Sequence, residues 1–253
     1  MLYGMYLSAG GALVEEARQA VIANNIANSG TAGYKSDAAS FRKRLTEARE
    51  GTAGSGARPD PLLEGLSGGV FLDEISFSRQ PGPLFATGNP LDLAIRGDGF
   101  FAVSDGQRTL YTRSGSFRLN AAGELVTADG RFRVLGVDGR PIRLGPGKVE
   151  VGPRGTITVD GRPAGRILVA GKLDPSLFEK TGGSYFRYLG SGNPPASAAE
   201  VAQGHLEGSD VNAVGEMVKL IQSHRAYEAN LQMVRIQDST LGRSVNELGR
   251  ITA

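Results

Sequence analysis

The chain has 253 residues, with 28 Lys and Arg against 26 Asp and Glu, so its formal net charge is +2. This balance gives no argument for binding nucleic acid or an anionic membrane surface. The absence of Cys excludes disulfides and thiolate metal sites, and two His are too few for a His-rich metal centre.

No stretch approaches the ~18 consecutive apolar residues that a membrane-spanning helix needs. The N-terminus lacks a basic segment followed by a continuous apolar core, which a cleaved secretory signal of the usual kind would have. We therefore expect no direct membrane insertion and, together with the composition, no bound cofactor or metal.

A helix is predicted at the N-terminus, over residues 1–28. Its apolar positions Leu7, Val14 and Val21 recur every seven residues, beside a second apolar row, and form a broad stripe. The pattern ends in residues that tolerate the left-handed backbone conformation at a helix C-terminus: Asn24, Asn25, Asn28, Gly30 and Gly33. Residues 1–35 are assigned to a terminal helical domain.

The next two regions differ in their periodicity. Residues 36–69 are rich in Gly, Ser, Ala and Pro toward their C-terminal side and are predicted to be a linker. From Val70 to Gln203, apolar residues alternate with polar ones in short runs, as at Phe71, Ile75 and Phe77. Asp-Gly pairs, the strongest short-range hairpin signal, separate many of these runs and begin at Asp98, Asp105, Asp129, Asp138 and Asp160. Residues 70–203 are therefore predicted to form an antiparallel, hairpin-rich β domain.

The last region, residues 204–253, carries the strongest helical pattern, from Val211 to Ile251 without a proline. One row of the predicted seam consists of Leu220, Tyr227, Val234, Leu241 and Leu248. The second row, three residues before each, consists of Met217, His224, Leu231, Asp238 and Val245. A seam of about five heptads is typical of a coiled coil, and the helix would be about 60 Å long. Such a rod cannot cover its own seam.

The first helix is the simplest partner for this seam within the chain, which gives an α+β fold with paired terminal helices around a central β domain. Two helices still leave apolar stripe exposed, so assembly with other copies is expected. The polar seam positions stay open to two interpretations. His224 is a packed or rim residue, and Asp238 either sets the register of the seam or faces solvent.

No catalytic constellation is convincing. Asp92, Asp98 and Asp105 lie close together, but two of them belong to Asp-Gly turns. The segment Ser114–Ser116 has no plausible His partner nearby for nucleophilic catalysis. The protein is therefore predicted not to be an enzyme.

Four stretches carry a family resemblance. They are residues 23–28 with 31–35 near the N-terminus, 87–95 with 97–101, 111–117 with 123–126, and finally 206–212 with 217–218 and 225–228. In these stretches the chain resembles the flagellar axial proteins, and within them the basal-body rod proteins. The family usually has Asn where this chain has Asp210, which puts in doubt any contact that needs a neutral amide there.

The resemblance implies a structural role. The terminal helices would pair as a coiled coil lining an axial tube, and subunits would stack helically into the periplasm-spanning rod that joins motor and hook. The implied partners are copies of this chain, other rod and hook proteins, and the flagellar type III export apparatus, which would export it without a cleaved signal peptide. A proximal rod protein is favoured, with a distal rod protein as the alternative.

The predicted subunit interface follows from the helical patterns together with this resemblance. It comprises Leu7, Val14, Val21, Asn24, Asn25, Asn28, Met217, Leu220, His224, Tyr227, Leu231, Val234, Asp238, Leu241, Val245 and Leu248. A different hypothesis is a surface-binding module for cell-wall glycan on a coiled-coil stalk. Its only dense aromatic group would be Tyr185, Phe186 and Tyr188, which core packing also explains.

Overall fold

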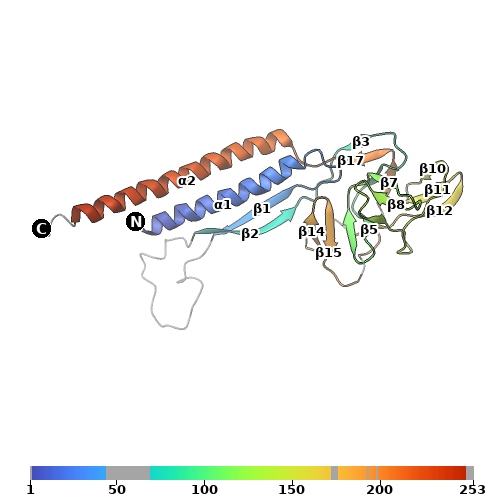
Figure 1. Ribbon diagram of the computed structural model, residues 1–253, viewed down its shortest axis with the longest axis horizontal. Helices are drawn as coiled ribbons and strands as arrows, with labels where there is room; N and C mark the ends of the chain where they lie inside the picture. The colour runs from blue at the N-terminus through green and yellow to red at the C-terminus, as the bar shows by residue number, and fades with distance from the viewer. Residues whose placement is uncertain (1, 44–68, 172–175, 193, 198, 249–253) are drawn as a thin grey trace. The chain divides into compact units, whose positions relative to one another are not determined.

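The computed structural model describes residues 2–43, 69–171, 176–192, 194–197 and 199–248 (Figure 1). The chain divides into two compact units. The helical unit comprises Met1–Ile26, Asp37–Ser76 and Ala213–Ala253, and the β unit comprises Ala27–Ser36 and Phe77–Asn212. The predicted α+β class is confirmed, because helices at the two ends of the chain flank a central, antiparallel β-rich region.

The helical unit contains α1 (Leu2–Ala27), α2 (Ala213–Leu248) and a two-stranded sheet of β1 (Asp37–Lys43) and β2 (Val70–Phe77). Within this unit α1 lies between α2 and the sheet in Figure 1. The predicted linker over 36–69 differs at its start, where Asp37–Lys43 form β1 with Phe41 under the side chain of Arg18. Residues 44–68 lie outside the described residues. Neither described helix has an apolar, uncharged window long enough to cross a membrane.

Fifteen short strands lie in the described part of the β unit. They are β3 (Leu84–Ala86), β4 (Leu93–Arg96), β5 (Phe100–Ser104), β6 (Thr109–Thr112), β7 (Phe117–Leu119), β8 (Leu125–Thr127), β9 (Arg133–Val134), β10 (Val149–Val151), β11 (Thr156–Val159), β12 (Arg162–Arg166), β13 (Val169–Ala170), β14 (Phe178–Gly182), β15 (Tyr185–Tyr188), β16 (Glu200–Gln203) and β17 (His205–Glu207). The main sheet runs in the order β14-β15-β6-β5-β9-β8-β7, with β13 also paired to β5. Smaller sheets join β10-β11-β12, β16-β4 and β17-β3.

Strand β5 is the centre of this unit because both of its faces are buried. Phe101 and Val103 pack into one apolar cluster, and Phe100 and Ala102 pack into the other. Successive side chains of a strand point to opposite faces, so four consecutive apolar residues serve two cores. The sequence pattern predicted only one buried face here.

The Asp-Gly turns divide into two groups. Asp105, Asp129 and Asp160 lie between strands that pair with each other, as the hairpin signal predicts. Asp160 and Gly161 both have positive φ, at 48° and 76°, which is the geometry of a tight hairpin turn. Asp98 instead connects β4 with β5, which pair with other strands, so it does not form a hairpin.

Candidate functional site

Two glycines of α1 lie close to amide side chains of α2. A Cβ atom on Gly4 would lie 2.9 Å from Nε2 of Gln237, and one on Gly11 would lie 3.0 Å from Oδ1 of Asn230. Residue numbers fall along α2 as they rise along α1, so the helices are antiparallel. Glycine at these positions lets the helix backbones approach closely without displacing the amide side chains opposite.

Ser223 of α2 is hydrogen-bonded to the middle of α1, where its hydroxyl lies within reach of both the carboxylate and the backbone carbonyl of Glu15. The hydroxyl of Ser223, which is 3% exposed, donates to the Glu15 carboxylate at 2.7 Å. The described contacts of α2 with α1 therefore come from Ser223, Asn230 and Gln237, which repeat every seven residues.

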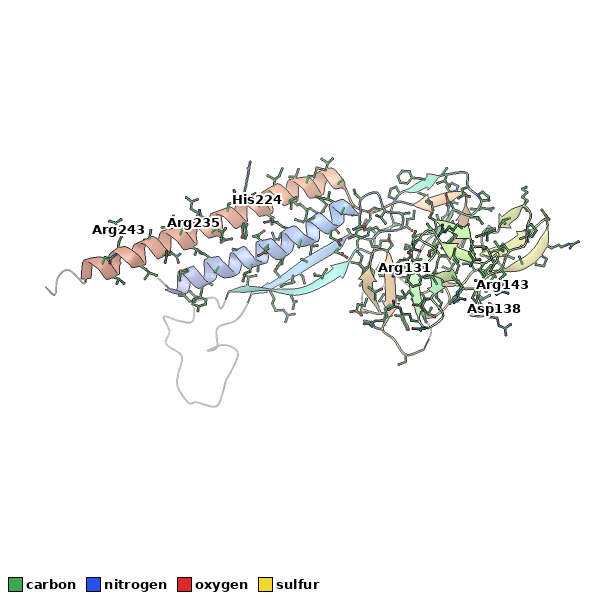
Figure 2. The ribbon with its side chains drawn as sticks, in the orientation of Figure 1. Arg131, Asp138, Arg143, His224, Arg235 and Arg243 are labelled. Atoms are coloured by element: carbon green, nitrogen blue, oxygen red, sulfur yellow. The ribbon has the colours of Figure 1, made fainter. Side chains whose placement is uncertain are left out.

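The predicted seam is only half correct as a description of packing within the chain. On α2 the half-buried members are Leu220, Tyr227, Leu231, Val234 and Leu241, and on α1 they are Leu7, Val14 and Val21. The other row of α2 turns outward: Met217, His224, Asp238 and Val245 are exposed. Figure 2 shows His224 projecting from α2 on the side away from α1.

The outward turn has a physical reason. The three α2 residues with described contacts to α1, which are Ser223, Asn230 and Gln237, stand three residues after Leu220 and its repeats. The row that contains Met217 and His224 is turned away from these contacts, and its members Asp238 and Val245 are likewise exposed. The coiled-coil pairing of the prediction is therefore not established by these contacts, and the side chain of Leu248 lies outside the described residues.

The asparagines at the end of α1 stabilise the chain itself. Asn25 is 2% exposed, and its amide brackets the backbone of Asp37, accepting from N and donating to O at 2.8 Å each. Asn24 donates to the Asp37 carboxylate at 3.1 Å. In the β unit, Asn28 accepts a backbone hydrogen bond from Thr31. Asn25 is buried within its own unit, so its first role is to fix where β1 begins.

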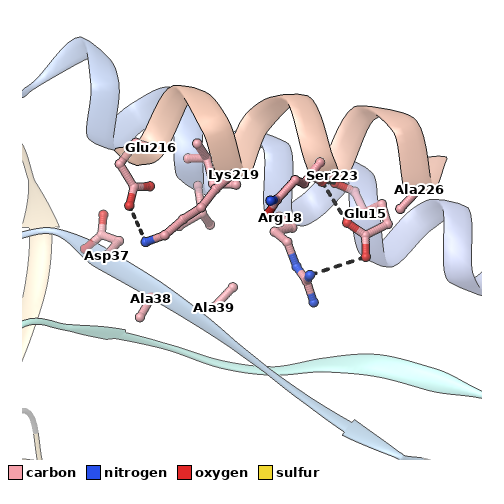
Figure 3. A pocket seen from close by; sticks show the side chains of 12 residues that line it. Glu15, Arg18, Asp37, Ala38, Ala39, Glu216, Lys219, Ser223 and Ala226 are labelled. Atoms are coloured by element: carbon pink, nitrogen blue, oxygen red, sulfur yellow. Dashed lines mark hydrogen bonds and ion pairs between the residues drawn. The ribbon is translucent and has the colours of Figure 1, made fainter. Parts of the chain in front are cut away.

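A polar groove of about 330 Å³ lies between α1, β1 and the first turns of α2 (Figure 3). Two ion pairs line it: Lys219 with Glu216 at 2.6 Å and Arg18 with Glu15 at 3.5 Å. Each cation already faces a carboxylate of its own helix, and the third carboxylate of the lining, Asp37, accepts a hydrogen bond from Asn24. Among the described residues no group of His, Asp and Glu is arranged to hold a metal ion.

The β unit contains a buried ionic cluster that the sequence patterns did not single out as a site. Both oxygens of the Glu207 carboxylate are engaged, Oε1 by Nζ of Lys35 at 2.6 Å and Oε2 by Nη1 of Arg113 at 3.1 Å. All three side chains are at most 1% exposed. Backbone groups complete the shell: Gly82 N–H donates to Glu207, and Lys35 donates to the carbonyl of Gln80.

The cluster contains two cations, Lys35 and Arg113, and one anion, Glu207, so it has an excess of one positive charge. Burial lowers the pKa of Arg113, and the neighbouring Glu207 carboxylate opposes that shift. Carbonyl oxygens supply the remaining compensation, since Nη2 of Arg113 donates to Gly97 at 2.6 Å and Nη1 to Ile95 at 3.3 Å. A buried charge is tolerated only when it is paired and hydrogen-bonded, so these partners must all be in place together.

The cluster joins three segments that lie far apart in the sequence. Lys35 follows the end of α1, Arg113 follows β6, and Glu207 ends β17 shortly before α2. Gly33 allows these segments to approach closely. Its N–H donates to the Glu207 carbonyl, and an added Cβ would lie only 2.2 Å from the Ser114 nitrogen. Its φ of +67° also favours glycine. Each segment belongs to a stretch that carried the family resemblance, which was the available signal for the cluster.

Asp210 retains a structural contact despite the substitution noted above. Its carboxylate accepts hydrogen bonds from the backbone N–H of Ser36 at 2.7 Å and from the Ser36 hydroxyl at 3.2 Å. Both donors require only an acceptor oxygen. An acid therefore serves at this position, and the two contacts do not need a neutral amide.

The aromatic group considered for glycan binding packs into the core. Phe186 is fully buried, with ring centroids 4.8 Å from Phe77 and 4.9 Å from Phe100. Tyr188 stacks on Phe178 at 5.2 Å, and Tyr185 lies against Phe132 at 4.7 Å. These rings stabilise the main sheet and do not form an exposed stacking platform.

Three family profiles match the chain in order. Residues 5–35 match "Flagella basal body rod protein", residues 94–159 match "Flagellar hook protein FlgE/F/G D1 domain", and residues 202–248 match "Flagellar basal body rod FlgEFG protein C-terminal". The first and last matches contain α1 and α2 almost entirely, together with Lys35 and Glu207. The middle match contains β4 to β11 and Arg113.

Full-length relatives carry the same description. The chain is 37% identical to the flagellar basal-body rod protein FlgF of Caulobacter vibrioides, over 91% of each chain. It is 32% identical to FlgF of Rhizobium meliloti, over 98% of this chain and 99% of the relative. It is also 35% identical to the rod protein FlgG of Agrobacterium fabrum, over 92% and 94%.

Proposed function

The chain belongs to the flagellar basal-body rod proteins and is a structural subunit of that rod, and we propose that it polymerises helically through its terminal helices. The placement of apolar side chains in the helical unit supports this mechanism. Glycines of α1 face amide side chains of α2, and large apolar residues of α2 such as Met217 and Ile236 are about half exposed. Exposed apolar surface of this kind is typical of an assembly interface.

The packing of the β unit also supports the mechanism. Two apolar clusters and the Lys35–Glu207–Arg113 cluster are complete within it. A subunit can therefore carry a stable β unit while its helices gain most of their burial from neighbours. Long helices with little intrachain packing are marginal in water.

Within the rod, we assign the subunit to the proximal, FlgF-like position. The FlgF relative of Caulobacter vibrioides reaches 37% identity, against 35% for the FlgG relative of Agrobacterium fabrum. A distal, FlgG-like position is the alternative. The proposed partners are further copies of this chain, other rod and hook proteins, and the flagellar type III export apparatus, which would deliver the subunit without signal cleavage. The proposed role is non-enzymatic.

Electron cryotomography of basal bodies tests the assignment, with the subunit labelled in cells that carry it as their sole copy. We expect the label on the rod, on the motor side of the distal rod. Label on the hook or outside the basal body would contradict the proposal. Label on the distal rod would replace the proximal, FlgF-like assignment with the distal, FlgG-like one.

A substitution on the half-buried row of α2 tests the mechanism. Val234→Asp should abolish rod assembly, because it places a carboxylate in the helix seam, while circular dichroism shows a folded β unit. The matched control Asn246→Asp introduces the same acid at an exposed position of the same helix and should assemble normally. Normal rods from Val234→Asp would refute assembly through the helices.

A further inference from the structure

Two outward stripes run along the helical unit, one on each helix. The α1 stripe repeats at alternating spacings of three and four residues and is exposed throughout: Tyr6, Ala9, Leu13, Glu16, Ala20 and Ala23. Tyr6 is 77% and Leu13 is 67% exposed. Three of its six members are alanines, and Glu16 is its single charge.

The α2 stripe has the same heptad spacing and is also exposed throughout: Val214, Val218, Ile221, Arg225, Glu228, Gln232 and Arg235. Its first three members are 71%, 50% and 55% exposed. In contrast to the α1 stripe, its apolar residues are bulky, and a cation follows them at Arg225. Figure 2 shows Arg235 projecting away from α1.

The two stripes are complementary in size and charge when the helices run antiparallel. Within the chain, Gly4 opposes Gln237 and Gly11 opposes Asn230. The same register between the outward stripes sets Ala20 opposite Ile221 and Glu16 opposite Arg225. Ala20 and Ala23 then face Ile221 and Val218, as in interdigitated helix packing, and the lone carboxylate of the α1 stripe faces a guanidinium. Leu13 faces Glu228 in this register. Tyr6 would face Arg235, a pair suited to a cation–π contact.

We propose that the α1 stripe of one subunit docks antiparallel on the α2 stripe of the next copy, with Glu16 paired to Arg225. This inference rests on the proposed function and names the surfaces that carry it. The occupant is another copy because each stripe is the complement of the other and the same chain presents both. Docking of two α1 stripes would leave Glu16 facing a stripe that contains no cation.

The contact is heterologous, so it does not close after two subunits. Each added copy presents a free α1 stripe at one side and a free α2 stripe at the other. Such head-to-tail contacts generate open helical polymers or rings. An open series of helix pairs is the arrangement that a rod requires.

Cysteine cross-linking in the full chain tests the docking directly, because the native sequence contains no Cys. Ala20→Cys and Ile221→Cys are made in separate chains, which are mixed at a concentration that yields polymer and then oxidised. The mixture should give a disulfide-linked dimer that neither variant gives alone. The matched control pairs Ala20→Cys with Val245→Cys, an exposed site on α2 outside the stripe, and should not cross-link.

Charge exchange provides the second arm. Glu16→Arg or Arg225→Glu alone should reduce polymer yield at least about tenfold, because like charges across an interface cost several kcal/mol. The double variant should restore assembly. Arg243→Glu, on α2 beyond the α1 stripe in this register (Figure 2), should have no effect. All three positions are exposed, so circular dichroism should show unchanged folding.

The outcomes separate this inference from the proposed function. Polymer that forms without the mixed disulfide, or that the charge exchange does not restore, would overturn the docking and leave the rod assignment standing. Disulfides within Ala20→Cys alone would show a symmetric contact and also overturn it. Failure of the unmodified chain to polymerise at any concentration, together with its absence from basal bodies, would overturn both.

Discussion

The two units of this protein distribute polar and apolar side chains in opposite ways. In the β unit, large apolar residues such as Phe100 and Phe101 are fully buried, and the buried charges of Glu207 and its partners are satisfied within a few ångströms. In the helical unit, the described interhelix contacts are made by Ser223, Asn230 and Gln237, while apolar residues of α2 face outward. This difference motivates the proposal that the helical unit is completed by neighbouring subunits.

Buried polar atoms without a hydrogen-bond partner occur in both units. Among the described residues they are Nε2 of Gln19 and Oε1 of Gln237 in the helical unit and Nε of Arg113 in the β unit. A buried polar group left unpaired costs about 1–3 kcal/mol. Each unit therefore carries such a cost.

The largest effect is expected in the β unit, from Glu207→Gln. Removing the carboxylate leaves Lys35 and Arg113 buried without their anion, which should lower the free energy of unfolding by about 3–5 kcal/mol. Urea unfolding followed by circular dichroism measures the change. Glu200→Gln, at an exposed position of β16, is the control and should stay within about 0.5 kcal/mol of the native chain. Equal stability of the two variants would show that the cluster does not hold the β unit together.

An intermediate effect is expected in the helix pair, from Ser223→Ala. The variant loses the hydrogen bond to Glu15 and should lower the free energy of local opening of α1 and α2 by about 1 kcal/mol. Hydrogen exchange of the helix amides measures it, and β5 should keep its protection. Ser239→Ala is the control, because that hydroxyl bonds only to the carbonyl of Ile236 in its own helix. If α1 opens no more readily in Ser223→Ala than in the control, the helices are held by other contacts.

The smallest effect on folding is expected on the outward stripe, from Val218→Ser. Val218 is half exposed, so the free energy of unfolding of the monomer should change by no more than about 0.5 kcal/mol. Polymer yield, measured by sedimentation, should nevertheless fall. Destabilisation by several kcal/mol would mean that Val218 is packed within the subunit. The claim that the outward apolar residues of α2 are unpacked in the monomer would then be wrong.

The periodicities of the sequence predicted much of this arrangement. Heptad spacing predicted both terminal helices, and the lack of proline added support for the second. Alternating apolar and polar residues with Asp-Gly turns predicted an antiparallel β region. Both signals are local, because helix and strand periods follow from backbone geometry alone. The start of β1 was missed, since Asp37–Lys43 take their position from the buried Asn25 and not from a pattern of their own.

The sequence by itself determined the two helices, the β class and the family, because each depends on short-range patterns or on motifs several residues long. Only the tertiary structure decided which row of α2 faces α1 and which charges meet in the interior. Heptad spacing gives candidate rows, but the choice between the row containing Met217 and the row containing Ser223 depends on Gly4, Gly11 and Glu15, more than 200 residues away. Likewise, nothing local to Lys35, Arg113 or Glu207 indicates that the three share one buried site, because chain topology alone brings them together.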